Sequence, residues 1–244
     1  MSKFVVMASW DDVPHLSKEQ KDDLWKEIPE YQRDARSKGI PQLGSGAVYP
    51  IQEDEIKVKD FQIPPHWKRL YGFDVGWNWT AAVWLAINPD DKVTYIYSIY
   101  KKGKAEPVVH TEAINGRGDW IPGAVDPAAQ GSSQIDGRRL VDEYATLGLN
   151  LYFADNGVET GLLKVWQALS SGRLKIFQSC LPWFEEFRLY RRDEKGKIVK
   201  TNDHLMDASR YGMGSLDIAE EQPDPDAHRD HDINTQTSAT AGWY

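Results

Sequence analysis

Apolar residues recur along the first half of the chain in three runs that only short turn segments separate. The first two runs flank Gly76, and glycine adopts the positive φ angles that tight connections need. A Pro-Asp turn at residues 88–91 leads into the third run. The pattern predicts an antiparallel β-meander with strands at residues 68–75, 80–87 and 92–101.

The hydrophobic period changes after residue 105, where helical and strand patterns begin to alternate. A meander followed by strand-helix-strand units predicts an α/β fold, with a mixed β-sheet covered by helices on both faces. In this second part we expect helices at residues 106–116, 133–146 and 157–170, and strands at residues 121–125, 149–154 and 174–178.

Two further helices and a basic hairpin are expected beyond the last of these strands. Residues 181–189 and 202–216 have helical patterns, and Asn202 is expected to be the N-cap of the second helix. Residues 190–201 between them indicate a hairpin with its turn near Gly196.

The two ends of the chain differ from its middle. A strand at residues 3–9 and a helix that begins with the Ser17–Gln20 capping box cannot bury a core by themselves, and residues 37–65 are rich in glycine and proline. We therefore predict three regions: residues 1–60 are the end of a preceding unit and a linker, residues 61–219 are the folded domain, and residues 220–244 are an acidic, disordered tail.

Charge and cysteine content narrow the classes of function. The net charge of −8 over 244 residues argues by itself against a nucleic-acid partner, yet residues 217–232 carry −6 whereas residues 188–200 carry +4. The single cysteine, Cys180, excludes an internal disulfide and a thiolate zinc site. The sequence has no signal-peptide pattern and no apolar run of about 18 residues, so we expect a cytosolic protein with no membrane partner.

Three aspartates occupy comparable places in the expected fold. Asp74 lies late in the first strand, Asp126 ends the first strand after the meander, and Asp207 lies in the last helix. If the two strands are parallel neighbours, their carboxyl ends open a crevice in which the three side chains converge. Converging carboxylates repel one another, and Mg²⁺ or Mn²⁺ relieves that repulsion. Two such ions would support hydrolysis of a phosphodiester.

Residues beside these aspartates each admit two roles. Asp203 either caps its helix or binds metal, and His204 either donates a hydrogen bond behind the ligands or acts as a base near the scissile phosphate. Asp155 ends a neighbouring strand, where a turn role is favoured over a role as ligand. The Thr80 hydroxyl is expected to bond within the first hairpin.

Basic and aromatic residues provide candidate contacts to DNA. The basic hairpin either lies against a DNA backbone or is a solvated charged turn. Trp77 and Trp79 flank the turn after Asp74, and core packing is expected for at least one of them. The candidate phosphate contacts are Arg191, Arg192, Lys195 and Lys197 in the hairpin and the pair Arg138 and Arg139, followed by Lys101, Lys102 and Lys104.

Three sequence motifs resemble a known family. The stretches GFDVGWNWTAAVW, VDPAAQG and NDHLMDASRYGMG are similar, in order and spacing, to the acidic motifs of the C-terminal nuclease domain of terminase large subunits from tailed double-stranded DNA bacteriophages of the headful-packaging type. The resemblance extends over about residues 48–216 and implies a ribonuclease H-like fold. It also implies that Asp74, Asp126 and Asp207 are the catalytic metal ligands.

The resemblance implies a function and partners. A terminase nuclease is a metal-dependent endonuclease that cuts concatemeric viral DNA with little sequence preference, working with an ATPase motor domain of the same protein, a portal and a small terminase subunit. It acts in the host bacterial cytoplasm, transiently at the procapsid portal. No G-x-x-x-x-G-K-[ST] motif occurs in the sequence, so residues 1–60 are expected to be the end of such a motor and its linker.

Two other functions remain possible at this point. One is a module that docks on DNA or on the portal and cleaves only with the motor present. The other is a different ribonuclease H-like nuclease, such as a junction resolvase, and the DHLMDASRY motif of the last helix argues against it.

Overall fold

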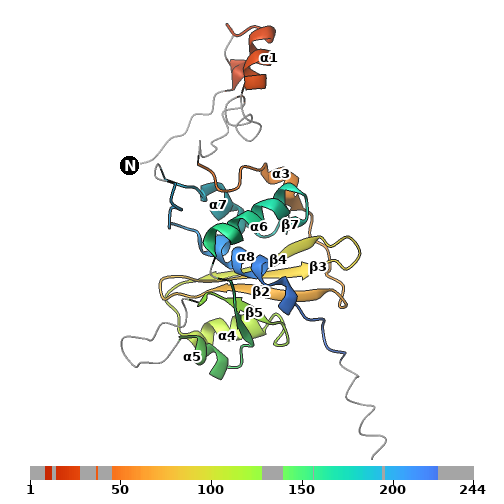
Figure 1. Ribbon diagram of the computed structural model, residues 1–244, viewed down its shortest axis with the longest axis vertical. Helices are drawn as coiled ribbons and strands as arrows, with labels where there is room; N and C mark the ends of the chain where they lie inside the picture. Colours follow the sequence, from red (N-terminus) through yellow and green to blue (C-terminus); the bar gives the residue numbers. More distant parts are fainter. Residues whose placement is uncertain are drawn as a thin grey trace, which may run out of the picture.

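The structure is a computed structural model that describes residues 9–12, 15–27, 37, 46–127, 140–155, 157–193 and 196–224 (Figure 1). Its strands are β1 (Lys57–Val58), β2 (Lys68–Asp74), β3 (Thr80–Ile87), β4 (Thr94–Lys102), β5 (Gly123–Val125), β6 (Leu151–Phe153) and β7 (Leu174–Phe177). Its α-helices of seven residues or more are α1 (Lys18–Glu27), α4 (Pro107–Asn115), α5 (Leu140–Thr146), α6 (Val158–Ser170), α7 (Leu181–Leu189) and α8 (His204–Gly214). The short helical turns are η1 (Trp10–Asp12), α3 (Glu53–Ile56) and η4 (Leu216–Ile218).

Within the described residues, the strands form one sheet in the order β1-β7-β4-β3-β2-β5-β6. Strands β2, β3 and β4 pair antiparallel as the predicted meander, and the Thr80 hydroxyl closes the first hairpin with a 2.9 Å bond to the Gly76 carbonyl. Strand β5 pairs parallel to β2, and β7 pairs parallel to β4. The predicted mixed sheet is therefore confirmed.

Helices cover both faces of the sheet, as Figure 1 shows with α4 and α5 on one side and α6, α7 and α8 on the other. Side-chain alternation along β2 explains the two layers, because Tyr71 and Phe73 point into a core with α4 and α5, whereas Leu70 points into the larger core with α6, α7 and α8. Strand β3 lies between them, and Trp84 and Leu85 are buried on opposite faces. Burial on both faces accounts for the continuous apolar sequence of β3.

Helix α8 packs directly on β2 because glycine leaves room for it. A Cβ atom on Gly72 would lie 1.8 Å from the Ala208 carbonyl oxygen, and one on Gly212 would lie 2.5 Å from Leu85 Cδ1. Only a backbone without side chains at these two points allows the helix to approach so closely. This contact fixes where the acidic residues of α8 lie relative to the end of β2.

The N-terminal caps of α8 and α1 can be compared with the predicted ones. Asp203, and not Asn202, occupies the N-cap position of α8, because Asn202 has a positive φ of 53° and precedes the helix by one further residue. The N-terminal capping box is confirmed, since Ser17 N–H donates to Gln20 Oε1 at 3.0 Å and Gln20 N–H donates to Ser17 Oγ at 3.2 Å.

Residues ahead of position 61 contribute to the sheet and to its core. Strand β1 pairs with β7, and Tyr49 and Ile56 are buried in the larger core. At the other end, Glu220 forms a β-bridge with Arg69. Residues 3–8 of the predicted strand at residues 3–9, and the tail from residue 225, lie outside the described residues, and the predicted division into domains stays a prediction.

Candidate metal centre

Asp74 and Asp126 follow neighbouring parallel strands at the same end of the sheet. Phe73 of β2 pairs with Val125 of β5, and each aspartate is the next residue along its strand direction. The carboxyl ends of β2 and β5 therefore present the two acids side by side, as predicted.

Helix α8 brings two more acids to the same end. Asp203 and Asp207 are one helical turn apart, and both are buried, with 5% and 7% of their surface exposed. Burial raises the pKa of Asp74, and the negative charges of Asp207 and Asp203 raise it further, against the lowering effect of its bond to His204. The pKa of Asp74 thus depends on the carboxylates of α8 as well as on its own burial.

His204 is the direct partner of Asp74. Its Nδ1 atom lies 2.8 Å from Asp74 Oδ2, and this hydrogen bond is the main reason why the pKa of His204 is raised. A raised pKa favours the imidazolium, which balances part of the negative charge of the acidic residues. His204 thus contacts the predicted ligand, as the sequence suggested.

Asp207 is held by two cations on its two oxygens. Lys200 Nζ lies 2.7 Å from Oδ2, and Arg210 Nη2 lies 3.3 Å from Oδ1. Burial disfavours the charge of both cations, but the contacts with Asp207 outweigh this effect and raise the pKa of Lys200 and of Arg210. Lys200 Nζ also lies 3.2 Å from Asp203 Oδ2.

Asp126 is tied to α8 through Tyr211, four residues after Asp207. Burial raises the pKa of Tyr211, and a hydrogen bond with Asp126 raises it further against the lowering effect of Arg210. The three predicted ligands are consequently all placed at one end of the sheet, around the N-terminal half and middle of α8.

The donor set fits a hard divalent cation. Asp74, Asp126, Asp203 and Asp207 offer only oxygen atoms, which Mg²⁺ and Mn²⁺ prefer. Among the described residues, Asp203 Oδ2 is buried and accepts no hydrogen bond of regular geometry, although Lys200 Nζ lies within ion-pair distance of it. Across the described residues, however, no three or more aspartate, glutamate, histidine or cysteine side chains form a group that could hold a metal ion in the arrangement seen here. Lys200 contacts Asp207 and His204 contacts Asp74 instead.

Glu186 is a functional neighbour that the sequence analysis missed. It is 3% exposed, accepts a 2.7 Å bond from Leu205 N–H in the first turn of α8, and pairs with Lys101 Nζ at 2.6 Å. Glu186 thereby caps α8 from helix α7. No local pattern reveals this role, because the partners lie 19 and 85 residues away in the sequence.

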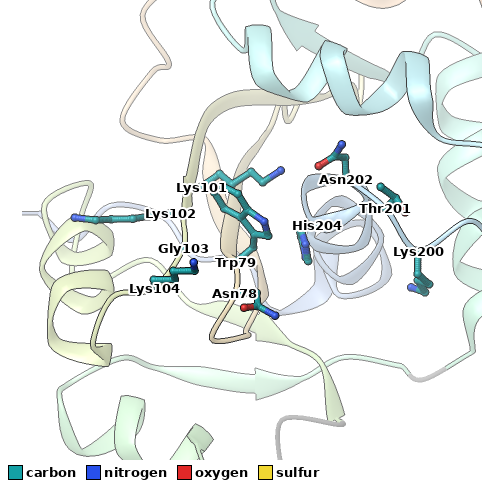
Figure 2. A pocket seen from close by; sticks show the side chains of 10 residues that line it. All are labelled: Asn78, Trp79, Lys101, Lys102, Gly103, Lys104, Lys200, Thr201, Asn202 and His204. Atoms are coloured by element: carbon teal, nitrogen blue, oxygen red, sulfur yellow. The ribbon is translucent and has the colours of Figure 1, made fainter.

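A basic cleft of about 860 Å³ adjoins the acidic residues. One wall is the end of β4 and the turn after β2, the other is the segment that leads into α8, and Figure 2 shows Trp79 and Lys101 facing His204 across the gap. The cleft is lined by Asn78, Trp79, Lys101, Lys102, Gly103, Lys104, Lys200, Thr201, Asn202 and His204, which include four lysines and no acid.

The rim of the cleft on the β4 side is fixed by backbone contacts. Lys104 N–H donates to the Trp77 carbonyl at 2.9 Å, and Lys104 has a positive φ of 51°. Lys101 Nζ lies 4.8 Å from the centre of the Trp79 ring. Trp77 and Trp79 are 62% and 44% exposed, so the expectation that at least one packs in the core is wrong.

The predicted phosphate contacts outside the cleft differ in their surroundings. Arg192 forms a two-pronged ion pair with Glu159 of α6, at 2.9 and 2.6 Å, and is therefore engaged within the protein. Arg191 and Lys197 are exposed. Lys195, Arg138 and Arg139 lie outside the described residues.

Asp155, the acid that follows β6, has the turn role that the sequence favoured over a role as metal ligand. Asp155 is exposed, and its Oδ1 accepts a 3.0 Å bond from Gly157 N–H in the turn after β6.

Comparison with known proteins identifies the family. Residues 72–216, more than half of the chain, match the family model described as the terminase RNaseH-like domain. The chain belongs to this terminase family. It is 37% identical over 219 residues to the terminase large subunit of Salmonella phage P22, and this match covers 86% of the chain and 44% of that relative. The chain therefore spans less than half the length of that relative.

Solved terminase structures share the fold. The P22 large terminase nuclease domain superimposes with a TM-score of 0.68 at 35% identity, covering 73% of the chain and 96% of that domain. The large terminase nuclease from the thermophilic phage G20c, solved with bound magnesium, has a TM-score of 0.54 at 13% identity, covering 71% of the chain and 99% of that protein, and this supports the fold alone. The ribonuclease H-like terminase fold predicted from the three motifs is confirmed.

Proposed function

We propose that this terminase domain is a metal-dependent endonuclease that hydrolyses phosphodiester bonds in double-stranded DNA. The observation that carries the proposal is the set of buried carboxylates at one end of the sheet, directly beside a cleft lined by four lysines. Mg²⁺ or Mn²⁺ held here, with two ions expected when DNA is bound, would activate water and stabilise the leaving oxygen.

The residues of the chain divide this work. Asp74, Asp126 and Asp207 would hold the cation through carboxylate oxygens, and the buried Asp203 would add a further oxygen. His204 keeps Asp74 oriented through its Nδ1 contact. Arg210 holds the far oxygen of Asp207, so that the other oxygen is directed toward Lys200 and the cleft side.

The lysines of the cleft bind the DNA backbone. Lys102 and Lys104 are exposed on the β4 wall of the cleft. Lys101 is half-buried, and its Nζ atom donates a hydrogen bond to Glu186. Phosphate contacts carry no sequence information, which agrees with cleavage of little sequence preference. In the whole protein, this domain would cut concatemeric viral DNA in the host bacterial cytoplasm, transiently at the procapsid portal, together with an ATPase motor domain, a portal and a small terminase subunit.

A plasmid assay tests the proposal. Supercoiled plasmid incubated with the chain and Mn²⁺ or Mg²⁺ should become nicked and linear, and EDTA should stop the reaction. Asp74→Asn should lower the rate by more than about a hundredfold, because even residues behind the ligands of a metal contribute up to that factor. Asp155→Asn should cut at the wild-type rate, since Asp155 is a turn residue.

The same assay separates the alternative of a docking module. Such a module would retard plasmid DNA in a gel without cutting it, whatever the metal, and would require the motor for cleavage. The exposed lysines of the cleft fit that module as well, so retardation alone supports neither function. The terminase family match argues against the junction-resolvase alternative.

A further inference from the structure

Two cationic side chains, Arg210 and Lys200, contact the two oxygens of Asp207, and they differ in how easily each could move away from the carboxylate. Arg210, on Oδ1, is 4% exposed and its guanidinium lies 4.4 Å from the Tyr211 ring. Helix α6 packs against its stem, because a Cβ atom on Gly161 would lie 2.6 Å from Arg210 Cγ. Arg210 therefore cannot leave Asp207 without disrupting the packing of α6 on α8.

Lys200, on Oδ2, is free to move. Its side chain is 62% exposed, although the carboxylates that it contacts are 7% and 9% exposed. It lies in the irregular end of the basic hairpin, a few residues before α8, and it also lines the basic cleft (Figure 2). A change of its rotamers moves the ammonium into the cleft without moving the backbone.

Lys200 contacts the oxygens that a metal ion would use. Its ammonium lies 2.7 Å from Asp207 Oδ2 and 3.2 Å from Asp203 Oδ2, and the latter oxygen is buried and accepts no hydrogen bond of regular geometry from the part of the chain that the structure describes. An ammonium and a divalent cation on the same two oxygens would repel each other strongly. Only one of them can occupy these oxygens at a time.

We propose that Lys200 is a built-in competitor of the divalent cation, with its ammonium holding Asp207 Oδ2 and Asp203 Oδ2 until a metal ion displaces it into the cleft. The inference rests on the proposed metal centre and adds a residue that sets its affinity. Lys200 is thus a positioning residue: it keeps two buried carboxylates compatible before metal binds, and it lowers the affinity for metal by the free energy of its own contacts.

The test is a Mn²⁺ titration of the whole chain without DNA, with free Mn²⁺ measured by electron paramagnetic resonance. Lys200→Met should bind Mn²⁺ about twofold to fivefold more tightly, the range expected for loss of one solvent-accessible ion pair. Lys200→Gln should act in the same direction, and Lys200→Arg should stay near the wild type. Asp207→Asn provides the baseline for Mn²⁺ bound elsewhere on the acidic chain.

Lys68→Met is the matched control for the loss of one positive charge. Lys68 is exposed and begins β2, whereas Asp74 ends it, so the two lie about 20 Å apart at roughly 3.3 Å per residue. Lys68→Met should leave the affinity for Mn²⁺ unchanged. In EDTA, Lys200→Met should also unfold at a lower temperature than the wild type, so that stability and metal affinity change in opposite directions.

The outcomes distinguish this inference from the proposed function. If the wild type binds Mn²⁺ and Asp207→Asn does not, but Lys200→Met and Lys200→Gln bind equally well or more weakly than the wild type, the competition is overturned and the metal centre stands. If the wild type and Asp207→Asn bind Mn²⁺ alike, the metal centre itself is wrong.

Discussion

Charge balance around the buried carboxylates is the central feature at the scale of single residues. His204 holds Asp74, and Lys200 and Arg210 hold Asp207, at distances from 2.7 to 3.3 Å. Leaving a buried charge without a partner costs several kcal/mol, so each acid requires a cation of some kind. A site that alternates between side-chain cations and a metal ion satisfies this requirement in both states.

Glu186 is predicted to be critical for stability. Replacing Glu186 by alanine leaves Lys101 and the Leu205 N–H without their acceptor in a buried place, and should lower the free energy of unfolding by about 2–4 kcal/mol. Urea denaturation measures the change. The adjacent Glu185 is exposed, and Glu185→Ala should change the free energy of unfolding by less than about 0.5 kcal/mol. Equal effects of the two substitutions would contradict the capping role.

The close contact between α8 and β2 decides the geometry at the scale of elements. Gly72 and Gly212 let the helix lie on the strand, and Asp207 lies between them in sequence order and next to the end of β2. The acids of α8 reach Asp74 because of this approach.

Gly72→Ala should therefore disrupt the domain. Its Cβ atom would meet the Ala208 carbonyl oxygen at 1.8 Å, so helix α8 would have to move away, and we expect a loss of more than about 3 kcal/mol in unfolding free energy. Thermal unfolding followed by circular dichroism measures it. Gly214→Ala, at the last residue of α8 with open space around it, should be neutral or stabilising. A stable Gly72→Ala variant would show that the approach is not needed.

Helix α4 is joined to β4 by a buried histidine that makes stability depend on pH. His110 Nδ1 lies 2.8 Å from the Tyr100 hydroxyl and Nε2 lies 3.2 Å from the Ala105 carbonyl, and burial lowers the pKa of His110. The unfolded chain then binds the proton more readily than the folded one, so the stability from His110 is present above about pH 6.5 and is lost as the pH falls.

Urea denaturation between pH 5 and pH 8 checks this sign. Because His204, whose pKa is raised, acts in the opposite direction in both proteins, the test is the difference between them: on acidification through this range the wild type should lose more stability, or gain less, than His110→Gln. His66 is exposed, and His66→Gln should leave the profile as it is. A profile that does not respond to the substitution of His110 would contradict the role of its burial.

The order of the elements could be predicted from the sequence, whereas the ion pairs could not. Strands β2, β3 and β4 stand out because their apolar runs are bounded by turn residues. The placement of Asp74 beside Asp126 follows from the parallel pairing of β2 with β5. Lys200 and Glu186 gave no such signal. A lysine in a basic hairpin looks solvated, and an acid in a short helix looks exposed, until the fold brings their partners near. Asn202 and Asp203 are equally good N-caps by residue type, so the sequence could not decide between them, and α8 begins directly after Asp203.

At the scale of the whole molecule, positive and negative charges are unevenly distributed. The chain carries a net charge of −8, yet the described residues that line the cleft beside the carboxylates include four lysines and no acid. A local basic surface is what a phosphate backbone needs, whatever the total charge. The acidic composition therefore does not argue against a DNA partner, because the cleft offers a local basic surface.

DNA binding should depend on salt through this cleft. Each phosphate contact contributes about 0.9 to the slope of log affinity against log salt, so Lys102→Ala with Lys104→Ala should reduce the slope by about 2. Fluorescence anisotropy with a labelled duplex, in an Asp74→Asn background that prevents cutting, measures the slope. Lys68→Ala should leave it unchanged. If instead Arg191→Ala and Lys197→Ala reduce the slope and the cleft variant does not, the DNA lies along the hairpin.

The most direct measurement of the central claim is anomalous diffraction from crystals of the chain soaked in Mn²⁺. The claim is that carboxylates distant in sequence, at the ends of β2 and β5 and in α8, share a divalent cation. An anomalous peak within coordination distance of Asp74 and Asp207, absent from Asp207→Asn crystals, is the predicted result. Crystals that take up Mn²⁺ only at other places, with Lys200 still bound to Asp207, would contradict it.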